Sequence, residues 1–133
     1  MIKILKFFFL CGTILTLLLG RGYAAVPIPS TPAGACLGAW LPAFNSGDEK
    51  LLKAFYDTYS GPGGIEDAHK LRSMIGRIVL LEIIVDEKFE IQALVKLTKE
   101  GKRCRFRIRM DENKPSAFRD MSILLGTTRP FPE

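Results

Sequence analysis

Four arginines alternate with apolar residues in the second half of the chain. The basic positions are Arg103, Arg105, Arg107 and Arg109. In an extended strand, side chains two residues apart lie on the same face, roughly 6–7 Å from each other. The spacing therefore predicts a cationic row on one face of a strand, which is suited to binding a protein partner. A solvated sheet face without a partner is the simpler interpretation of the same pattern.

Apolar residues are expected beside this row. Leu94 and Lys96 in the preceding strand are expected to point outward, and so is Leu124 in the following strand. If Glu82 points outward, three more apolar residues share its face: Ile78, Leu80 and Ile84. Apolar side chains next to arginines are typical of interface cores, so we predict a protein partner or self-association through this face. Nucleic acid is not an expected partner, because the export predicted below separates the chain from it.

Acid–base catalysis requires an ionisable residue held beside a donor in a pocket. The candidates by residue type are Tyr56, Asp57, Tyr59 and His69. His69 lies in an amphipathic helix, where a histidine is usually at the surface. The inward strand phase contains no Asp, Glu or His; it consists of Val79, Leu81, Ile83, Phe89, Ile91, Val95, Phe106, Ile108, Met121 and Ile123. This composition favours a packed core, and we assign no catalytic residue.

Other catalytic and cofactor motifs are missing from the sequence. It contains neither the Gly-x-Ser-x-Gly elbow nor the Ser-x-x-Lys pair of serine hydrolases. The glycine-rich stretch 61–64 is not followed by Lys-Ser or Lys-Thr, so it predicts a turn and not a phosphate-binding loop. Beyond the N-terminal segment described next, two cysteines and one histidine are too few for the usual four-ligand zinc site. We expect neither a metal ion nor a cofactor.

The first 24 residues have the order of a secretory signal peptide. Lys3 and Lys6 precede an apolar run from Phe7 to Leu19, and Gly-Tyr-Ala at positions 22–24 supplies small residues for cleavage. The run is shorter than the roughly 20 apolar residues that span a bilayer, which favours cleavage over a retained anchor. We expect a periplasmic or secreted protein, with membrane attachment only through an uncleaved signal.

Removal of this segment changes the charge and the cysteine count. It holds three of the 19 basic residues and none of the 14 acidic ones, so the rest of the chain has an excess of only two positive charges. Two cysteines remain, and an oxidising compartment permits them to pair. Cys36 lies one turn before Trp40, and Cys104 has the inward strand phase. We therefore predict a disulfide between them, with two free thiols as the alternative.

Three helices are predicted before residue 77. The first carries an apolar stripe, and Pro42 within it is expected to cause a kink or an early end. A polar corner at 45–49 follows, in which Ser46 is predicted to cap the second helix through a capping box. The third helix covers residues 65–75, with Met74 among its inward residues.

The hydrophobic period changes from helix to strand at residue 77. Four strands are predicted, over residues 77–85, 89–97, 103–110 and 118–125. The fold class is therefore α+β, with three N-terminal helices packed on one face of a four-stranded antiparallel meander sheet. The predicted organisation is a signal peptide at 1–24, an extended arm at 25–32, the domain at 33–126 and a proline-containing tail at 127–133.

The string Trp40-Leu41-Pro42-Ala43-Phe44-Asn45-Ser46-Gly47-Asp48 resembles the corner between the first two helices of the NTF2-like superfamily, a cystatin-like α+β roll. The basic strand and the Met110-Asp111 pair after it resemble a branch found N-terminal to secreted serine hydrolases of the β-lactamase type. The resemblance implies an accessory domain. It also implies a cone that can hold a small apolar ligand, with candidate pocket residues Trp40, Tyr56, Tyr59 and Phe106.

These expectations leave more than one class of function open. The leading hypothesis is an exported, non-catalytic binding or accessory module. The main alternative is a small-molecule enzyme of the ketosteroid-isomerase or hydratase type that uses the cone, and a scaffold that only dimerises is a third. In the branch it resembles, a proline-containing linker leads into a catalytic domain. This domain therefore either works alone or is the accessory half of a hydrolase.

The signal-peptide hypothesis predicts the start of the exported protein. Cleavage after Ala24 should leave Ala25 at the N-terminus, because the small residues at 22–24 follow a short apolar run. Mass spectrometry of secreted or periplasmic material should show the loss of residues 1–24. An intact N-terminus in the membrane fraction would contradict the prediction.

Overall fold

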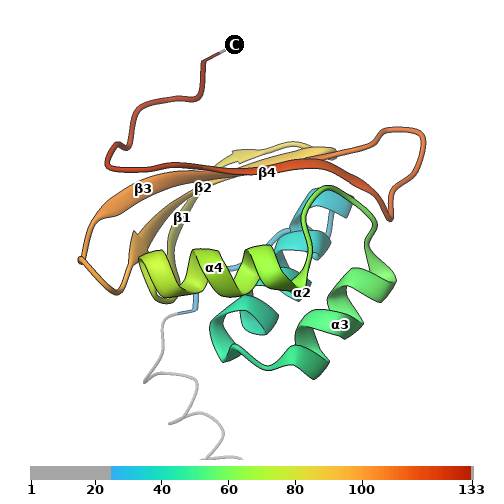
Figure 1. Ribbon diagram of the computed structural model, residues 1–133. Helices are drawn as coiled ribbons and strands as arrows, with labels where there is room; N and C mark the ends of the chain where they lie inside the picture. Colours follow the sequence, from blue (N-terminus) through green and yellow to red (C-terminus); the bar gives the residue numbers. More distant parts are fainter. Residues whose placement is uncertain (1–24, 133) are drawn as a thin grey trace, which may run out of the picture.

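The computed structural model describes residues 25–132, in which helices precede a sheet (Figure 1). The helices are α2 (Pro32–Ser46), α3 (Glu49–Thr58) and α4 (Ile65–Ile75). The strands are β1 (Ile78–Asp86), β2 (Glu90–Leu97), β3 (Arg103–Met110) and β4 (Phe118–Leu124), in the antiparallel order β1-β2-β3-β4. The helices all lie on one side of the sheet. The α+β class and the meander are thus confirmed, while the predicted signal peptide at 1–24 lies outside the described residues.

The corner between α2 and α3 differs in detail from the prediction. Pro42 does not end α2, which continues to Ser46 and stops at Gly47 with a φ of 65°. Asp48, and not Ser46, caps α3, because its carboxylate accepts a hydrogen bond from Lys50 N at 2.8 Å. Ser46 is still part of α2, and its hydroxyl donates to Ala43 O at 2.8 Å. The same hydroxyl accepts from Asp48 N at 3.0 Å, so it links the end of α2 to the cap residue of α3 without capping α3 itself.

Helix α2 crosses the inner face of the sheet from one end to the other. At its start, Ala33 N donates to Lys88 O in the turn between β1 and β2. In its middle, Trp40 stacks on Phe44 at 4.6 Å and on Phe106 of β3 at 5.3 Å between ring centroids. Stacked aromatic rings add to the free energy gained by burying their area. This contact joins the longest helix to the centre of the sheet.

The end of α2 is tied to the start of β1 by one side chain. Asn45 Nδ2 donates to Ile78 O at 2.8 Å, and Ile78 N donates to Asn45 Oδ1 at 2.8 Å. Arg72 of α4 donates to the Asn45 carbonyl at 3.1 Å. Asn45 thereby satisfies both backbone groups of Ile78, which is buried, and joins three elements at one point.

The predicted inward phase of β1 is wrong in its first half. Ile78 is buried and Leu80 packs on the core, whereas Val79 is 44% exposed. The pairing register shifts between Leu80 and Glu82, so that Leu81 is an extra residue in the ladder. An extra residue of this kind is a β-bulge, and it reverses the alternation of side chains. Glu82 therefore points outward as expected, although Ile78 and Leu80 point inward.

The Asn45 clamp predicts a large loss of stability on truncation. Asn45→Ala should lower the free energy of unfolding by about 2–3 kcal/mol, because it leaves a buried N–H and C=O without partners. Asn113→Ala in an exposed loop is the matched control and should change it by less than about 0.5 kcal/mol. Urea denaturation followed by circular dichroism measures both. Equal midpoints for the two variants would show that the clamp is dispensable.

Candidate functional site: the outer face of the sheet

The face of the sheet opposite the helices carries the predicted arginine row. The side chains of Cys104, Phe106, Ile108 and Met110 are at most 2% exposed and point into the core. The four arginines between them therefore lie on the outer face. Leu94 pairs with Arg105 and Lys96 with Arg103 across β2 and β3. The structure thus brings together all six residues of the predicted surface: Leu94, Lys96, Arg103, Arg105, Arg107 and Arg109.

One carboxylate on β4 organises two of the arginines. Arg109 Nε donates to Asp120 Oδ2 at 2.7 Å, and this hydrogen bond raises the pKa of Arg109. Arg107 Nε lies 3.8 Å from Asp120 Oδ1, within ion-pair distance. Asp120 was not among the predicted site residues. Its outward phase beside Ser122 was the only signal in the sequence that could have indicated it.

Arg105, the third arginine in the middle of the row, makes its side-chain hydrogen bonds with uncharged groups. Arg105 Nη1 donates to Gln92 Oε1 at 3.2 Å, and no carboxylate is its partner among the described residues. Arg103 and Lys96, at the end of the row, are exposed. Cations therefore outnumber the carboxylates on β2, β3 and β4 of this face, since Asp120 and Glu90 stand against six positive side chains, the predicted five and Arg119 of β4. The surface remains electropositive.

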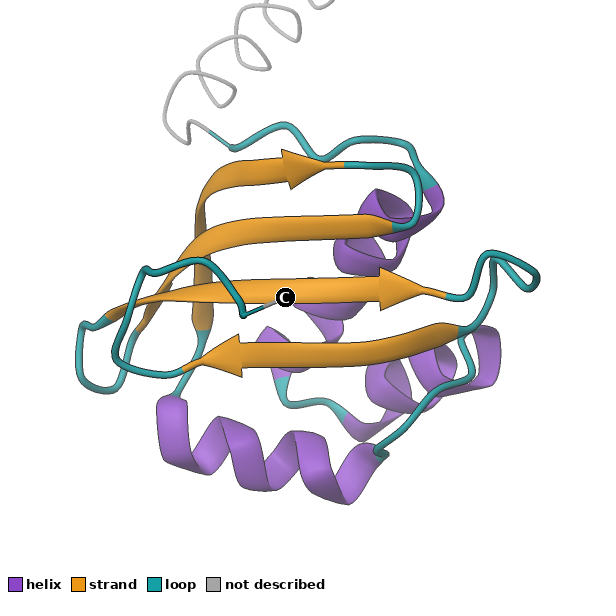
Figure 2. Ribbon diagram, turned by 90° about the horizontal axis from the view of Figure 1, so that it is seen from above, coloured by secondary structure: helices purple, strands orange, loops and turns teal. Residues whose placement is uncertain are grey.

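The C-terminal segment, residues 127–132, folds back over this face (Figure 2). Arg105 N donates to Thr127 O at 3.1 Å, and Arg105 Nε donates to Thr128 O at 3.2 Å. The Phe131 ring lies over Arg107, with its centroid 4.3 Å from Cζ. The sequence predicted only a proline-containing tail here. The structure shows that this tail covers the centre of the predicted surface.

The predicted interior pocket is filled by its own side chains. Trp40 and Phe106 are at most 3% exposed and stack on each other. Tyr56 and Tyr59 pack around Phe55, each at 5.1 Å between ring centroids. Burial raises the pKa of Tyr56, while the nearby Trp40 N–H lowers it. That indole N–H is buried and has no hydrogen-bond partner in the described part of the chain.

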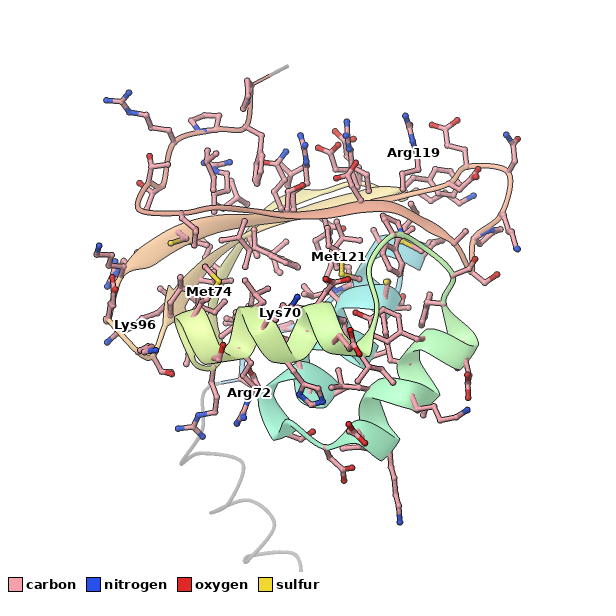
Figure 3. The ribbon with its side chains drawn as sticks, viewed as in Figure 1. Lys70, Arg72, Met74, Lys96, Arg119 and Met121 are labelled. Atoms are coloured by element: carbon pink, nitrogen blue, oxygen red, sulfur yellow. The ribbon has the colours of Figure 1, made fainter. Side chains whose placement is uncertain are left out.

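A cavity opens elsewhere, between the end of α4 and the β2–β3 hairpin. It has a volume of about 310 Å³, near the lower limit for ligand sites. Its lining is mainly apolar and includes Met74, Leu97, Cys104 and Leu125. Met74 was predicted to be inward, but it is 61% exposed because it lies at the rim of this cavity and rises from α4 toward the sheet (Figure 3).

The catalytic candidates do not form an acid–base site. Asp57 is exposed and pairs with Lys53 at 2.7 Å, and His69 lies 3.6 Å from the exposed Glu49. Within residues 25–132, no polar or charged residue is buried, and no three His, Cys, Asp or Glu residues cluster as metal ligands would.

In the same range, no helix has the length and hydropathy needed to cross a membrane.

The predicted disulfide between Cys36 and Cys104 is wrong. Both cysteines are buried and free. Cys36 lies near the start of α2, at the end of the sheet that holds the β1–β2 turn, whereas Cys104 lies near the opposite end, where α2 finishes. Nine residues of helix, roughly 13 Å, separate Cys36 from the Asn45 end. A disulfide requires Cα atoms within about 7 Å, so both cysteines can belong to one core without pairing.

Comparisons with known proteins do not identify a relative. A scan against protein-family models, a search of curated proteins and a search of solved structures each found no match to this chain. The function must therefore be inferred from the geometry of the chain itself.

The buried Cys36 thiol predicts a loss of stability in alkali. Burial raises the pKa of Cys36 from 9.0 to about 12. Above pH 9 the unfolded chain releases this proton and the folded chain retains it, so the free energy of unfolding falls as pH rises toward 12, by up to about 1.4 kcal/mol per pH unit. Urea titrations from pH 8.5 to 10 should show this slope, and Cys36→Ala should show a clearly shallower one.

The Cys104→Ala variant is the control for that experiment, because it keeps Cys36 and should keep the slope. Tyr56 and Tyr59, whose pKa values burial also raises, contribute equally to both variants. An unchanged slope in Cys36→Ala would show that this thiol does not titrate differently in the folded and unfolded states.

Proposed function

We propose that this protein is an exported, non-catalytic binding module that docks a protein partner through the outer face of its sheet. The observation that carries the proposal is the electropositive row on β3, on the face that the described helices leave uncovered. Arginine side chains next to Leu94 and Leu124 combine charge with apolar area. Interface cores are enriched in arginine and depleted in lysine and acids, which supports a protein partner.

The partial burial of the central arginines supports the same proposal. The Arg107 side chain is 15% exposed and that of Arg109 is 38% exposed. Charged groups that are already partly desolvated lose less hydration on docking and interact more strongly with an opposite charge. Arginine is also more weakly hydrated than lysine and binds carboxylates in a bidentate way.

The NTF2-like resemblance supports an accessory role, because the motif that carries it is structural in this chain. Within the motif, Asn45 clamps Ile78, Gly47 ends α2 and Asp48 caps α3. None of these residues contributes to a buried ionisable pair. We propose that the domain is an NTF2-like roll that is associated with a hydrolase as a non-catalytic partner.

A small apolar ligand is the second candidate function. The specific observation in its favour is the cavity of about 310 Å³ whose lining is mainly apolar. Its polar lining residues include Lys102 and Glu100, which pair with each other at 3.0 Å. The cavity suits binding better than acid–base chemistry, since its floor is formed by Ile75, Leu97 and Cys104.

The outer-face proposal predicts where an acidic probe binds. A peptide of sequence Gly-Glu-Phe-Glu-Gly at millimolar concentration should shift NMR signals of β2, β3 and β4 and not those of the cavity. Lys96→Glu combined with Arg103→Glu should weaken its binding by about tenfold and make the remainder less sensitive to salt. Both residues are exposed, so folding should survive.

The matched control reverses the same charge on the helical side. Lys50→Glu with Lys70→Glu changes one exposed residue of α3 and one of α4, neither of which forms an ion pair among the described residues, and should leave the affinity unchanged within about twofold. Arg107→Glu is unsuitable because it would place a carboxylate against Asp120. Shifts at Met74, Leu97 and Leu125 would instead favour the cavity as the binding site.

A further inference from the structure

We infer that the C-terminal segment, residues 127–132, is a tethered occupant of the outer face, and that the partner which displaces it is an extended protein segment with a carboxylate next to an aromatic residue. The inference rests on the proposed function and specifies both the partner class and its competitor. It is drawn from three contacts of the segment with Arg105 and Arg107.

The segment contacts the face as a bound peptide would. The Thr128 carbonyl accepts from Arg105 Nε on the face, and the Thr127 carbonyl accepts from the Arg105 backbone N–H where β4 ends. The segment's single aromatic side chain, Phe131, covers the Arg107 guanidinium, an arrangement that cation–π attraction favours. The face can thus seat an extended chain and one aromatic ring.

With the C-terminal segment in place, one N–H donor of the Arg107 guanidinium has no acceptor. Arg107 Nε is buried and has no hydrogen-bond partner within residues 25–132, because Asp120 Oδ1 is 3.8 Å away. The described contacts of the segment with this arginine are made by the Phe131 ring, which is not an acceptor of this kind. A buried charged donor without an acceptor is costly, so a segment that places a carboxylate there gains an interaction beyond those described for residues 127–132.

The attachment of the segment is also weak enough to be displaced. Pro130 and Pro132 have no N–H to donate, so the segment cannot pair along the sheet as a regular strand. Its contacts with the arginines are two hydrogen bonds and one ring. The covered and open states therefore differ by few interactions, and a competing segment with one additional charge-assisted bond shifts the balance toward the open state.

The test removes the ring and asks whether an acidic peptide gains access. In full-length Phe131→Ala, fluorescein-labelled Gly-Glu-Phe-Glu-Gly should bind about fivefold more tightly than to the unmodified chain, measured by fluorescence anisotropy. Thr128→Ala, in the same segment, keeps the carbonyl that accepts from Arg105, the charge and the Phe131 ring, and should behave like the unmodified chain. The peptide Gly-Gln-Phe-Gln-Gly, which lacks carboxylates, should show no such gain.

NMR spectroscopy measures the contact between Phe131 and Arg107 directly. The Nε–H NMR signal of Arg107 should carry a ring-current shift and exchange slowly with water in the unmodified chain, and Phe131→Ala should remove both. Equal peptide affinity with and without Phe131, together with an unchanged Arg107 signal, would overturn the tethered occupant while leaving the binding face intact. Equal binding of the glutamine peptide would overturn the carboxylate class. If the Arg107 signal changes but no peptide binds to the outer face, the proposed function itself is wrong.

Discussion

The stacking of Trp40 on Phe106 determines which face of the sheet the helices cover. The contact places α2 across the centre of β3, and α2 in turn carries Phe44 into the same cluster. Once Phe106 is inside, strict alternation puts Arg105 and Arg107 outside. A slip of one residue would bury charged arginines against the helices, which is prohibitively unfavourable. The register of β3 is therefore strongly determined, and the cationic face is a direct consequence of it.

The outer face is not a uniform row of equivalent charges. Asp120 is shared by Arg107 and Arg109, Gln92 serves Arg105, and Arg103 faces solvent at the end. Arg119 of β4 also points away from the helices, which adds to the positive charge on this side (Figure 3). Pairing across strands thus holds the guanidinium planes in place without neutralising the face. A surface that is charged, ordered and partly desolvated is better prepared for docking than one of freely solvated side chains.

The resemblance and the proposed activity concern different parts of the molecule. The residues of the α2–α3 corner terminate one helix, start the next and hold the first residue of β1. They explain why the chain folds as an α+β domain. The outer face depends instead on β3, β4 and the C-terminal segment. The fold could therefore remain constant while its binding surface changes, since a fold does not by itself specify a function.

Local patterns in the sequence were sufficient for the elements and for the two faces of β2 and β3. The helical stripe around Trp40, the glycines at 47 and 76, and the alternation from Arg103 to Met110 each reflect constraints that act within a few residues. Only the tertiary structure decided the pairing of distant groups. The bulge at Leu81 depends on how β1 aligns with β2, so the period of β1 alone gave the wrong inward residues.

The same distinction applies to the candidate site. The arginines could be predicted from their spacing, but Asp120 as their acceptor and Phe131 as their cover could not, because the contacts depend on strand register and on the turn at Gly126. The cysteines could be assigned to the core from their phase, but the direction of α2 across the sheet determined that they lie at opposite ends of it. Sequence periodicity reports which face a residue occupies. The distance between two residues on the same face is set by the way the elements pack.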